Sequence, residues 1–288
     1  MAERLLPDRL KDLWQDVEHR LLTHEQFLQE QARGLAEYRR LWDEALICGN
    51  CTDLRQSLHE ELARYSGCRD LGEIERRCAS ALADVKGEWC GAVNRADDQS
   101  VAKFYNESEA MIYELMGWHS LVDDDSPLAY VVALLFARLH GCRTYLDFGA
   151  GVGSGAILFA RHGLEVTLAD ISSPMLDFSQ WRFCQRGLTS RFIDLKSTSL
   201  PANAFDLVAA MDVFEHLVNP AKTVTDLWQC LKPGGFLFGR FHSEVDEDRP
   251  HHIVQDFQPT LDRLHELGFE EVWRDEWLWG HQVFQKSQ

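Results

Sequence analysis

The second half of the chain alternates short apolar segments with segments of helical period. After Gly141, five apolar segments are typical of buried strands, and a helix-like stretch separates each neighbouring pair: Thr144–Phe148, Glu165–Ala169, Arg191–Asp194, Phe205–Met211 and Phe236–Phe241. Strands and helices in alternation imply right-handed crossovers and a parallel sheet covered by helices on both faces. The alternation therefore predicts an α/β fold.

The C-terminal segment breaks this rhythm. Leu261–Leu267 has helical period, and Gly268 is suited to end that helix. Glu270–Trp277 and His281–Gln285 then read as two strands with a short connection, which only an antiparallel pair allows.

The first 130 residues have helical period throughout. Thr23 with Gln26 predicts a capping box at the start of one helix, and Asp70 with Glu73 predicts another. We therefore expect an N-terminal helical domain over residues 1–130 and a sheet-containing domain over residues 131–288.

Composition excludes several classes of protein. The chain has 288 residues, of which 45% are hydrophobic, so it can bury a full core. Its net charge of −17 opposes binding to a phosphate backbone, and we expect no nucleic-acid partner. Its longest apolar segments fall far short of the roughly 20 residues of a bilayer span, so we expect no membrane partner.

The cellular location is predicted from the N-terminus and the cysteines. Residues 1–10 carry four charged side chains and no apolar core, unlike a signal peptide. Eight cysteines without secretion indicate reduced thiols in a cytoplasmic protein. Cys48 and Cys51 have the spacing of half a zinc site, but no second such pair follows, so we expect buried thiols rather than a metal.

The densest motif is the glycine-rich segment 145–155. A buried strand runs into Gly149, Gly151 and Gly153, and glycines there let backbone amides approach a ligand. The spacing also fits a dinucleotide fingerprint, which leaves a nicotinamide oxidoreductase as an alternative. Asp147 favours another ligand, because its carboxylate would repel a pyrophosphate but suits an ammonium group.

With Asp147 and these glycines, the chain resembles the class I S-adenosylmethionine-dependent methyltransferases. Four further motifs agree in order: Asp170, 23 residues after Asp147; Asp194; the segment 204–216, which is similar to the family's fourth-strand motif; and the segment 231–235, which is similar to its turn before the fifth strand. The resemblance covers roughly residues 128–288. It implies a Rossmann-like sheet of seven strands, the last two antiparallel, with S-adenosylmethionine as cofactor.

The resemblance also implies which residues contact the cofactor. They lie at strand ends and in the turns that follow, with Asp170 at the ribose and Asp194 at the adenine: Asp147, Gly149, Gly151, Gly153, Asp170, Ile171, Met175, Asp194, Leu195, Met211 and Asp212.

Methyl transfer from a sulfonium is an in-line displacement, so the protein mainly aligns the reactants and excludes water. A protonated acceptor still benefits from a base of near-neutral pKa, for which histidine is suited. We predict His216, His242 and His252 as catalytic residues.

The segment that contains Asp212, Glu215 and His216 is similar to one in the ubiquinone-pathway O-methyltransferases, where an acidic-x-x-Glu-His cluster has been linked to a divalent metal. This chain has Asp where those relatives have Glu, which shortens the reach. We therefore expect a structural or cofactor-contacting role for His216 and no metal.

The helices before the sheet are expected to cover the donor and shape the acceptor site. Aromatic and polar side chains in segment 104–119, together with one histidine of a later loop, are the predicted acceptor contacts: Tyr105, Tyr113, Trp118, His119 and His251. Aromatic residues at helical spacing are also typical of core, so we expect only one or two to serve.

These observations favour a methyltransferase that acts on the oxygen or nitrogen of a small metabolite. Two alternatives stay open: a donor-binding, non-catalytic partner subunit, and a methyltransferase that acts on a protein or peptide. The acidic N-terminal helices motivate the first alternative as a docking surface for a basic protein, and the same helices are the candidate interface of a homodimer.

Overall fold

A seven-stranded mixed sheet forms the centre of the molecule. The computed structural model describes residues 4–242, 246–254 and 256–288. The strand order is β3-β2-β1-β4-β5-β7-β6, with β7 antiparallel to both neighbours. The bounds are β1 Thr144–Phe148, β2 Glu165–Asp170, β3 Arg191–Asp194, β4 Phe205–Ala210, β5 Leu231–Arg240, β6 Phe269–Arg274 and β7 His281–Lys286. The predicted fold class, including the antiparallel terminal pair, is confirmed.

Helices cover both faces of this sheet because alternate strand residues point in opposite directions. Tyr145 and Leu207 belong to the larger core, and their neighbours Leu146 and Val208 belong to the smaller one. The larger core contains residues of α7 Ala129–Leu139, α8 Ser154–Arg161 and α9 Ser173–Gln185, and the smaller core contains residues of α10 Pro220–Cys230 and α11 Gln258–Glu266.

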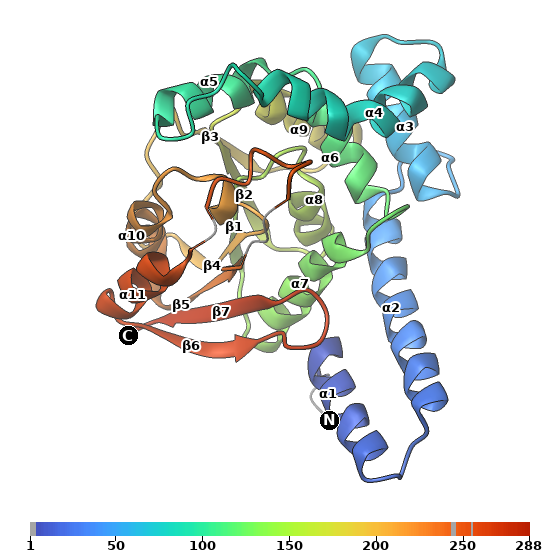
Figure 1. Ribbon diagram of the computed structural model, residues 1–288, viewed down its shortest axis with the longest axis vertical. Coiled ribbons are helices and arrows are strands. Elements are labelled where there is room, and N and C mark those ends of the chain that lie inside the picture. The colour runs from blue at the N-terminus through green and yellow to red at the C-terminus, as the bar shows by residue number, and fades with distance from the viewer. Residues whose placement is uncertain (1–3, 243–245, 255) are drawn as a thin grey trace.

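The N-terminal part consists of helices, as predicted. They are α1 Leu6–Glu18, α2 His24–Leu46, α3 Leu54–Ser66, α4 Leu71–Trp89, α5 Asp98–Glu107 and α6 Met111–His119, followed by the short η1 Ser126–Leu128. Figure 1 shows α1 and α2 along one side of the molecule and α5 near the end of the sheet that carries β3. In the described part of the chain, no helix has both the length and the apolar character needed to cross a bilayer.

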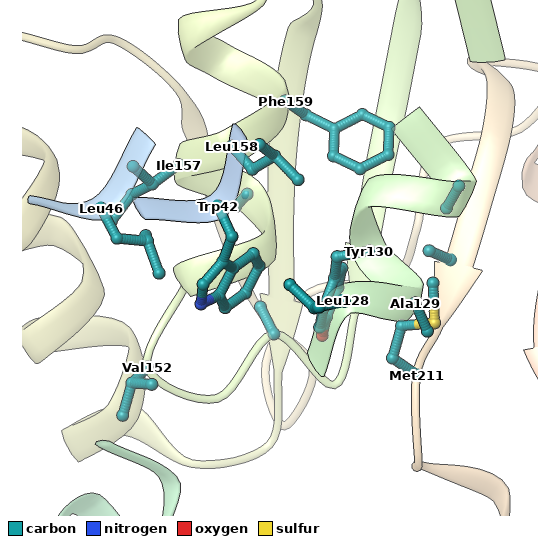
Figure 2. Packing of buried hydrophobic residues seen from close by; sticks show 14 of the residues in the cluster. Trp42, Leu46, Leu128, Ala129, Tyr130, Val152, Ile157, Leu158, Phe159 and Met211 are labelled. Carbon is teal, nitrogen blue, oxygen red and sulfur yellow. The ribbon is translucent and has the colours of Figure 1, made fainter. Parts of the chain in front are cut away.

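These helices share a core with the sheet. Trp42 of α2 is fully buried, and its ring stacks on Tyr130 of α7 at a centroid distance of 5.9 Å. Figure 2 shows this tryptophan beside Leu128, Tyr130 and residues of α8. The predicted division near residue 130 therefore falls within one continuous hydrophobic core.

The capping predictions are half right. Thr23 and Gln26 form the complete box, because each side chain accepts a hydrogen bond from the backbone amide of the other. Asp70 caps α4 through the amide of Gly72, whereas Glu73 pairs with Arg76 instead of closing a second box.

Two strand boundaries differ from the prediction by more than one residue. Segment 231–235, expected as a turn, belongs to β5 as a bulge: β4 advances from Phe205 to Leu207 while its partner advances from Leu231 to Phe236. The strand expected to reach Trp277 ends at Arg274, because the Asp275 carboxylate accepts the amides of residues 277–279 in a turn.

Gly155→Ala is expected to lower the free energy of unfolding by about 1–3 kcal/mol. A Cβ atom at this position would lie 2.1 Å from Cε1 of Tyr130, a buried ring that is held against Trp42. The matched control is Gly87→Ala in α4, whose Cβ would meet nothing within 4 Å and which we expect to stabilise by up to about 1 kcal/mol. Urea unfolding measures both; equal stability of wild type and Gly155→Ala would contradict the packing described here.

Candidate active site

A cavity of about 520 Å³ lies at the carboxyl ends of the central strands. Ligands of open α/β sheets bind at this edge, where the chain turns from strand to helix. Its lining includes the turn after β1, the end of β2, residues that follow β3 and β4, and side chains of α5 and α6. Among the predicted cofactor contacts it brings together Gly149, Gly151, Asp170, Ile171, Met175, Leu195, Met211 and Asp212.

The glycine turn forms one wall because no side chain fits there. Gly149 and Gly151 both have positive φ, and a Cβ would lie 2.6 Å from Val213 Cγ2 or 2.9 Å from Leu115 Cδ1, respectively. Gly153 also has positive φ, but its missing Cβ faces Ser179 and not the cavity. Gly153 is the N-cap of α8 and lies outside the described lining of the cavity, and its contact with the cofactor stays a prediction.

Asp170 fastens the glycine turn to the next strand. Its carboxylate accepts the amides of Gly151 and Ser172, each at 2.8 Å, and the residue also lines the cavity. Burial raises the pKa of Asp170, although these two hydrogen bonds lower it. Ser172 in turn caps α9, as predicted, with Pro174 in the first turn.

Asp147 lies deeper than predicted. Its side chain is fully buried beneath the glycine turn and is absent from the described lining of the cavity. Burial raises its pKa to about 8, so a neutral carboxyl group is favoured at pH 7. The structure therefore does not place this group where it would touch a ligand's ammonium.

Asp194 also lies outside the described lining of the cavity. It accepts a 2.7 Å hydrogen bond from Ser173 Oγ and pairs with Lys196 Nζ at 3.6 Å. Burial raises the pKa of this carboxyl, but the bonds from Ser173 and Lys196 outweigh burial and lower it. The following residues, Leu195 and Lys196, line the cavity instead.

Three of the predicted acceptor contacts lie at the covering helices' side of the cavity. Tyr105 of α5 and both Trp118 and His119 of α6 line it. Burial lowers the pKa of His119 to about 3, so its imidazole is neutral. Tyr113 is directed elsewhere: its hydroxyl accepts a 2.6 Å hydrogen bond from Arg77, whose guanidinium lies 3.8 Å from the ring centroid.

A smaller cavity of about 90 Å³, which we call the annex, adjoins the first. The two share Met111, Leu115, Trp118, Asp212 and His216. The annex adds mainly charged and polar residues: Glu114, Asp124, Ser126, Glu215, Arg240, Arg249, His251 and His252. A ligand in the larger cavity would therefore meet a polar chamber through a shared wall.

Charges in the annex are only partly paired. Arg240 donates a 3.2 Å hydrogen bond to Asp212. Glu215, in the 3-10 turn η2 Phe214–His216, is buried, and burial followed by the nearby Asp212 raises its pKa to about 8.

Two of the predicted catalytic histidines, His216 and His252, and the predicted acceptor contact His251 lie together in the annex. Burial is the largest cause that lowers the pKa of each, to about 2 for His251 and about 3 for His252. The third predicted catalytic residue, His242, is exposed beyond β5 and lies outside the described lining of both cavities.

Several lining residues were missed from the sequence. Lys196 lies two residues beyond the predicted Asp194, and Asp98 and Gln99 begin α5. Asn219 and Lys222 line the cavity at the start of α10, where the Asn219 side chain accepts the Lys222 amide at 3.0 Å. The Asn-Pro pair at 219–220 is a helix-start signal that could have indicated this last group. Cys48 and Cys51 are free thiols outside both cavities.

Known proteins match the central part of the chain. Residues 146–239 match the family model described as a methyltransferase domain. A ubiquinone biosynthesis O-methyltransferase of Azoarcus sp. (strain BH72) is 35% identical over 99 residues, or 32% of this chain and 41% of that protein. The protein of the same name from Serratia proteamaculans is 28% identical over 154 residues, which are 50% of this chain and 64% of that protein.

Residues 146–239 are therefore similar to a methyltransferase domain, and they lie in the seven-stranded sheet described above. The chain spans between about two fifths and two thirds of the length of these curated relatives.

Solved structures are similar in fold over about two thirds of this chain. A methyltransferase from Leishmania major aligns with a TM-score of 0.51 at 19% identity, over 69% of this chain and 88% of that one. The [4+2]-cyclase SpnF aligns with the same TM-score and identity, over 66% and 96%. Because one of these proteins is described as a cyclase, the fold alone does not determine the reaction.

Proposed function

We propose that this protein binds S-adenosylmethionine in the larger cavity and transfers its methyl group to a small molecule held at the annex. The observation that carries the proposal is the Asp170-anchored glycine turn, which lines a cavity that adjoins a polar chamber. The matched methyltransferase family supports the donor, and the relatives named O-methyltransferases support an oxygen acceptor.

The donor's parts are assigned by chemistry. Asp170 accepts hydrogen bonds from the ribose hydroxyls, and the backbone of Gly149 and Gly151 approaches the amino-acid portion. Met175 and Leu195 flank the adenine. Bound in this way, S-adenosylmethionine supplies an electrophilic methyl group.

The covering helices hold the acceptor and exclude water. Leu115 and Trp118 of α6 border both cavities, so an acceptor that spans them would lie beside the donor. The relatives named ubiquinone biosynthesis O-methyltransferases favour a small metabolite over a protein substrate. A base role for His216 or His252, a homodimer and a cytoplasmic location stay predictions.

Methyl transfer is tested with donor labelled in its methyl group and a panel of metabolites that carry hydroxyl or amino groups. We expect labelled product and one S-adenosylhomocysteine per methyl transferred. Turnover that leaves the labelled methyl on the donor would contradict the proposal and favour a reaction like that of a cyclase. Methyl transfer only after addition of a second protein would favour the partner-subunit alternative.

A further inference from the structure

Three histidines from two separate segments meet at the annex. His216 ends η2, and His251 and His252 lie in the loop before α11. One ring nitrogen of each can be chosen so that all three lie within 4.8 Å of one another. The His216 and His251 rings are parallel at a centroid distance of 5.2 Å, and the His252 ring stands edge-on to both.

The backbone holds the two segments together. The Glu215 carbonyl accepts the amides of Ile253 at 2.7 Å and Val254 at 3.0 Å. The His251 carbonyl lies 3.0 Å from His216 Nδ1, which donates to it as N–H. This bond leaves Nε2 of His216 with a free lone pair, the arrangement common in metal-binding histidines.

Buried polar atoms beside the histidines are unpartnered in the part of the chain that the structure describes. Glu215 is 2% exposed and its Oε2 atom has no hydrogen-bond partner there; His251 is 3% exposed and its Nδ1 has none. A buried carboxylate oxygen and a buried imidazole nitrogen are costly without a partner. A cation bound by the histidines would give a buried imidazole nitrogen its partner, and its positive charge would favour the ionised form of Glu215, which lines the same cavity.

We propose that His216, His251 and His252 bind one divalent transition-metal ion, with the Glu215 carboxylate as its nearby countercharge. Imidazole nitrogen favours zinc, cobalt or nickel, whereas magnesium and calcium prefer oxygen ligands. Asp212 is paired with Arg240, so this ligand set differs from the acidic cluster that the sequence suggested and uses only His216 from it.

The geometry requires a small adjustment. Nitrogens bound at about 2.1 Å in a tetrahedral site are about 3.4 Å apart. The nitrogens of the three histidines lie within 4.8 Å of one another. Ring rotations that shorten these nitrogen–nitrogen distances by about 1 Å would bring them to a common ion. Three protein ligands leave a fourth position, which, resting on the function proposed above, would take the acceptor's hydroxyl oxygen.

The test is metal binding by the full chain after chelator treatment. Cobalt(II) is followed by its visible absorption and zinc(II) by calorimetry. We expect one equivalent of each to bind, and His216→Gln, His251→Gln and His252→Gln each to weaken binding at least about 10-fold. The control is His265→Gln, which replaces an exposed histidine of α11 outside the described lining of both cavities and should leave binding unchanged.

Circular dichroism establishes whether each variant is folded. The titration of the wild type tests the proposal even if a variant does not fold. Failure of the folded wild type to bind stoichiometric cobalt or zinc would overturn the proposal. So would binding that all three substitutions leave unchanged, or tight magnesium binding without cobalt or zinc binding. Calorimetry with S-adenosylhomocysteine on the metal-free protein separates the two proposals. If the folded, metal-free protein does not bind this ligand, the result counts against the proposed function and not against the metal site.

Discussion

Replacing Asp170 by alanine is expected to weaken binding of S-adenosylhomocysteine by about 10- to 100-fold. The Asp170 carboxylate holds the amides of Gly151 and Ser172 at 2.8 Å and lines the cavity where the ribose is proposed to lie. Hydrogen bonds to a charged group contribute about 1.5–3 kcal/mol each, and 1.4 kcal/mol is a factor of ten in affinity. Isothermal titration calorimetry measures the dissociation constant directly.

Two further variants sharpen this prediction. Asp177→Ala removes an exposed carboxylate from α9, the helix that follows β2, and should leave the affinity for S-adenosylhomocysteine unchanged. Asp170→Asn keeps the side-chain shape and one acceptor oxygen, so its affinity for S-adenosylhomocysteine should lie between those of the wild type and of Asp170→Ala. Wild-type affinity in a folded Asp170→Ala protein would place the donor elsewhere.

Replacing Arg182 by methionine is expected to lower the free energy of unfolding by about 3–5 kcal/mol, the range for breaking a buried ion pair. The side chains of Glu61, Arg182 and Arg186 are fully buried where α3 meets α9. Arg182 donates to Glu61 at 3.1 Å and to the Val152 carbonyl in the glycine turn at 2.6 Å. Its removal leaves a buried carbonyl without that donor and Glu61 with Arg186 as its remaining ion-pair partner.

The comparison for Arg182→Met is Arg191→Met, which breaks a 3.3 Å pair with Glu165 at the surface. Exposed pairs contribute at most about 1 kcal/mol, so this variant should unfold near the wild-type urea concentration. A loss below about 1 kcal/mol in Arg182→Met would mean that the Arg182 contacts contribute little to the attachment of α3 to α9 and the glycine turn.

The sequence predicted those parts of the fold that depend on local pattern. Apolar segments of strand length, alternating with helical period, indicated the sheet and its antiparallel end. The caps formed by Thr23 and Ser172 were predictable because each depends on contacts within one helical turn. The bulge at residues 232–235 could not be predicted in this way, because it depends on how β5 pairs with β4.

The site was predictable to the level of strand ends but not of side-chain direction. Asp147 lies next to the end of a parallel strand, and Asp170 and Asp194 each end one, yet of the three only Asp170 is in the described lining of the cavity. The other two are directed away by burial and by bonds to Ser173 and Lys196, contacts that lie outside each strand's own sequence.

Long-range contacts explain the remaining differences. Tyr113 has helical spacing like Tyr105, but Arg77 of α4 draws it away from the cavity. His216 and His251 are 35 residues apart, and the hydrogen bonds to the Glu215 carbonyl bring their segments together. Helical period identifies a buried face without indicating which neighbour covers it.

Calorimetric titration of the full chain with S-adenosylhomocysteine tests the central claim most directly, because it asks for donor binding and requires no acceptor. We predict saturable binding at one site per chain, weakened in Asp170→Ala and unchanged in Asp177→Ala. No heat of binding at millimolar ligand, with the protein folded by circular dichroism, would contradict the assignment of the larger cavity to S-adenosylmethionine.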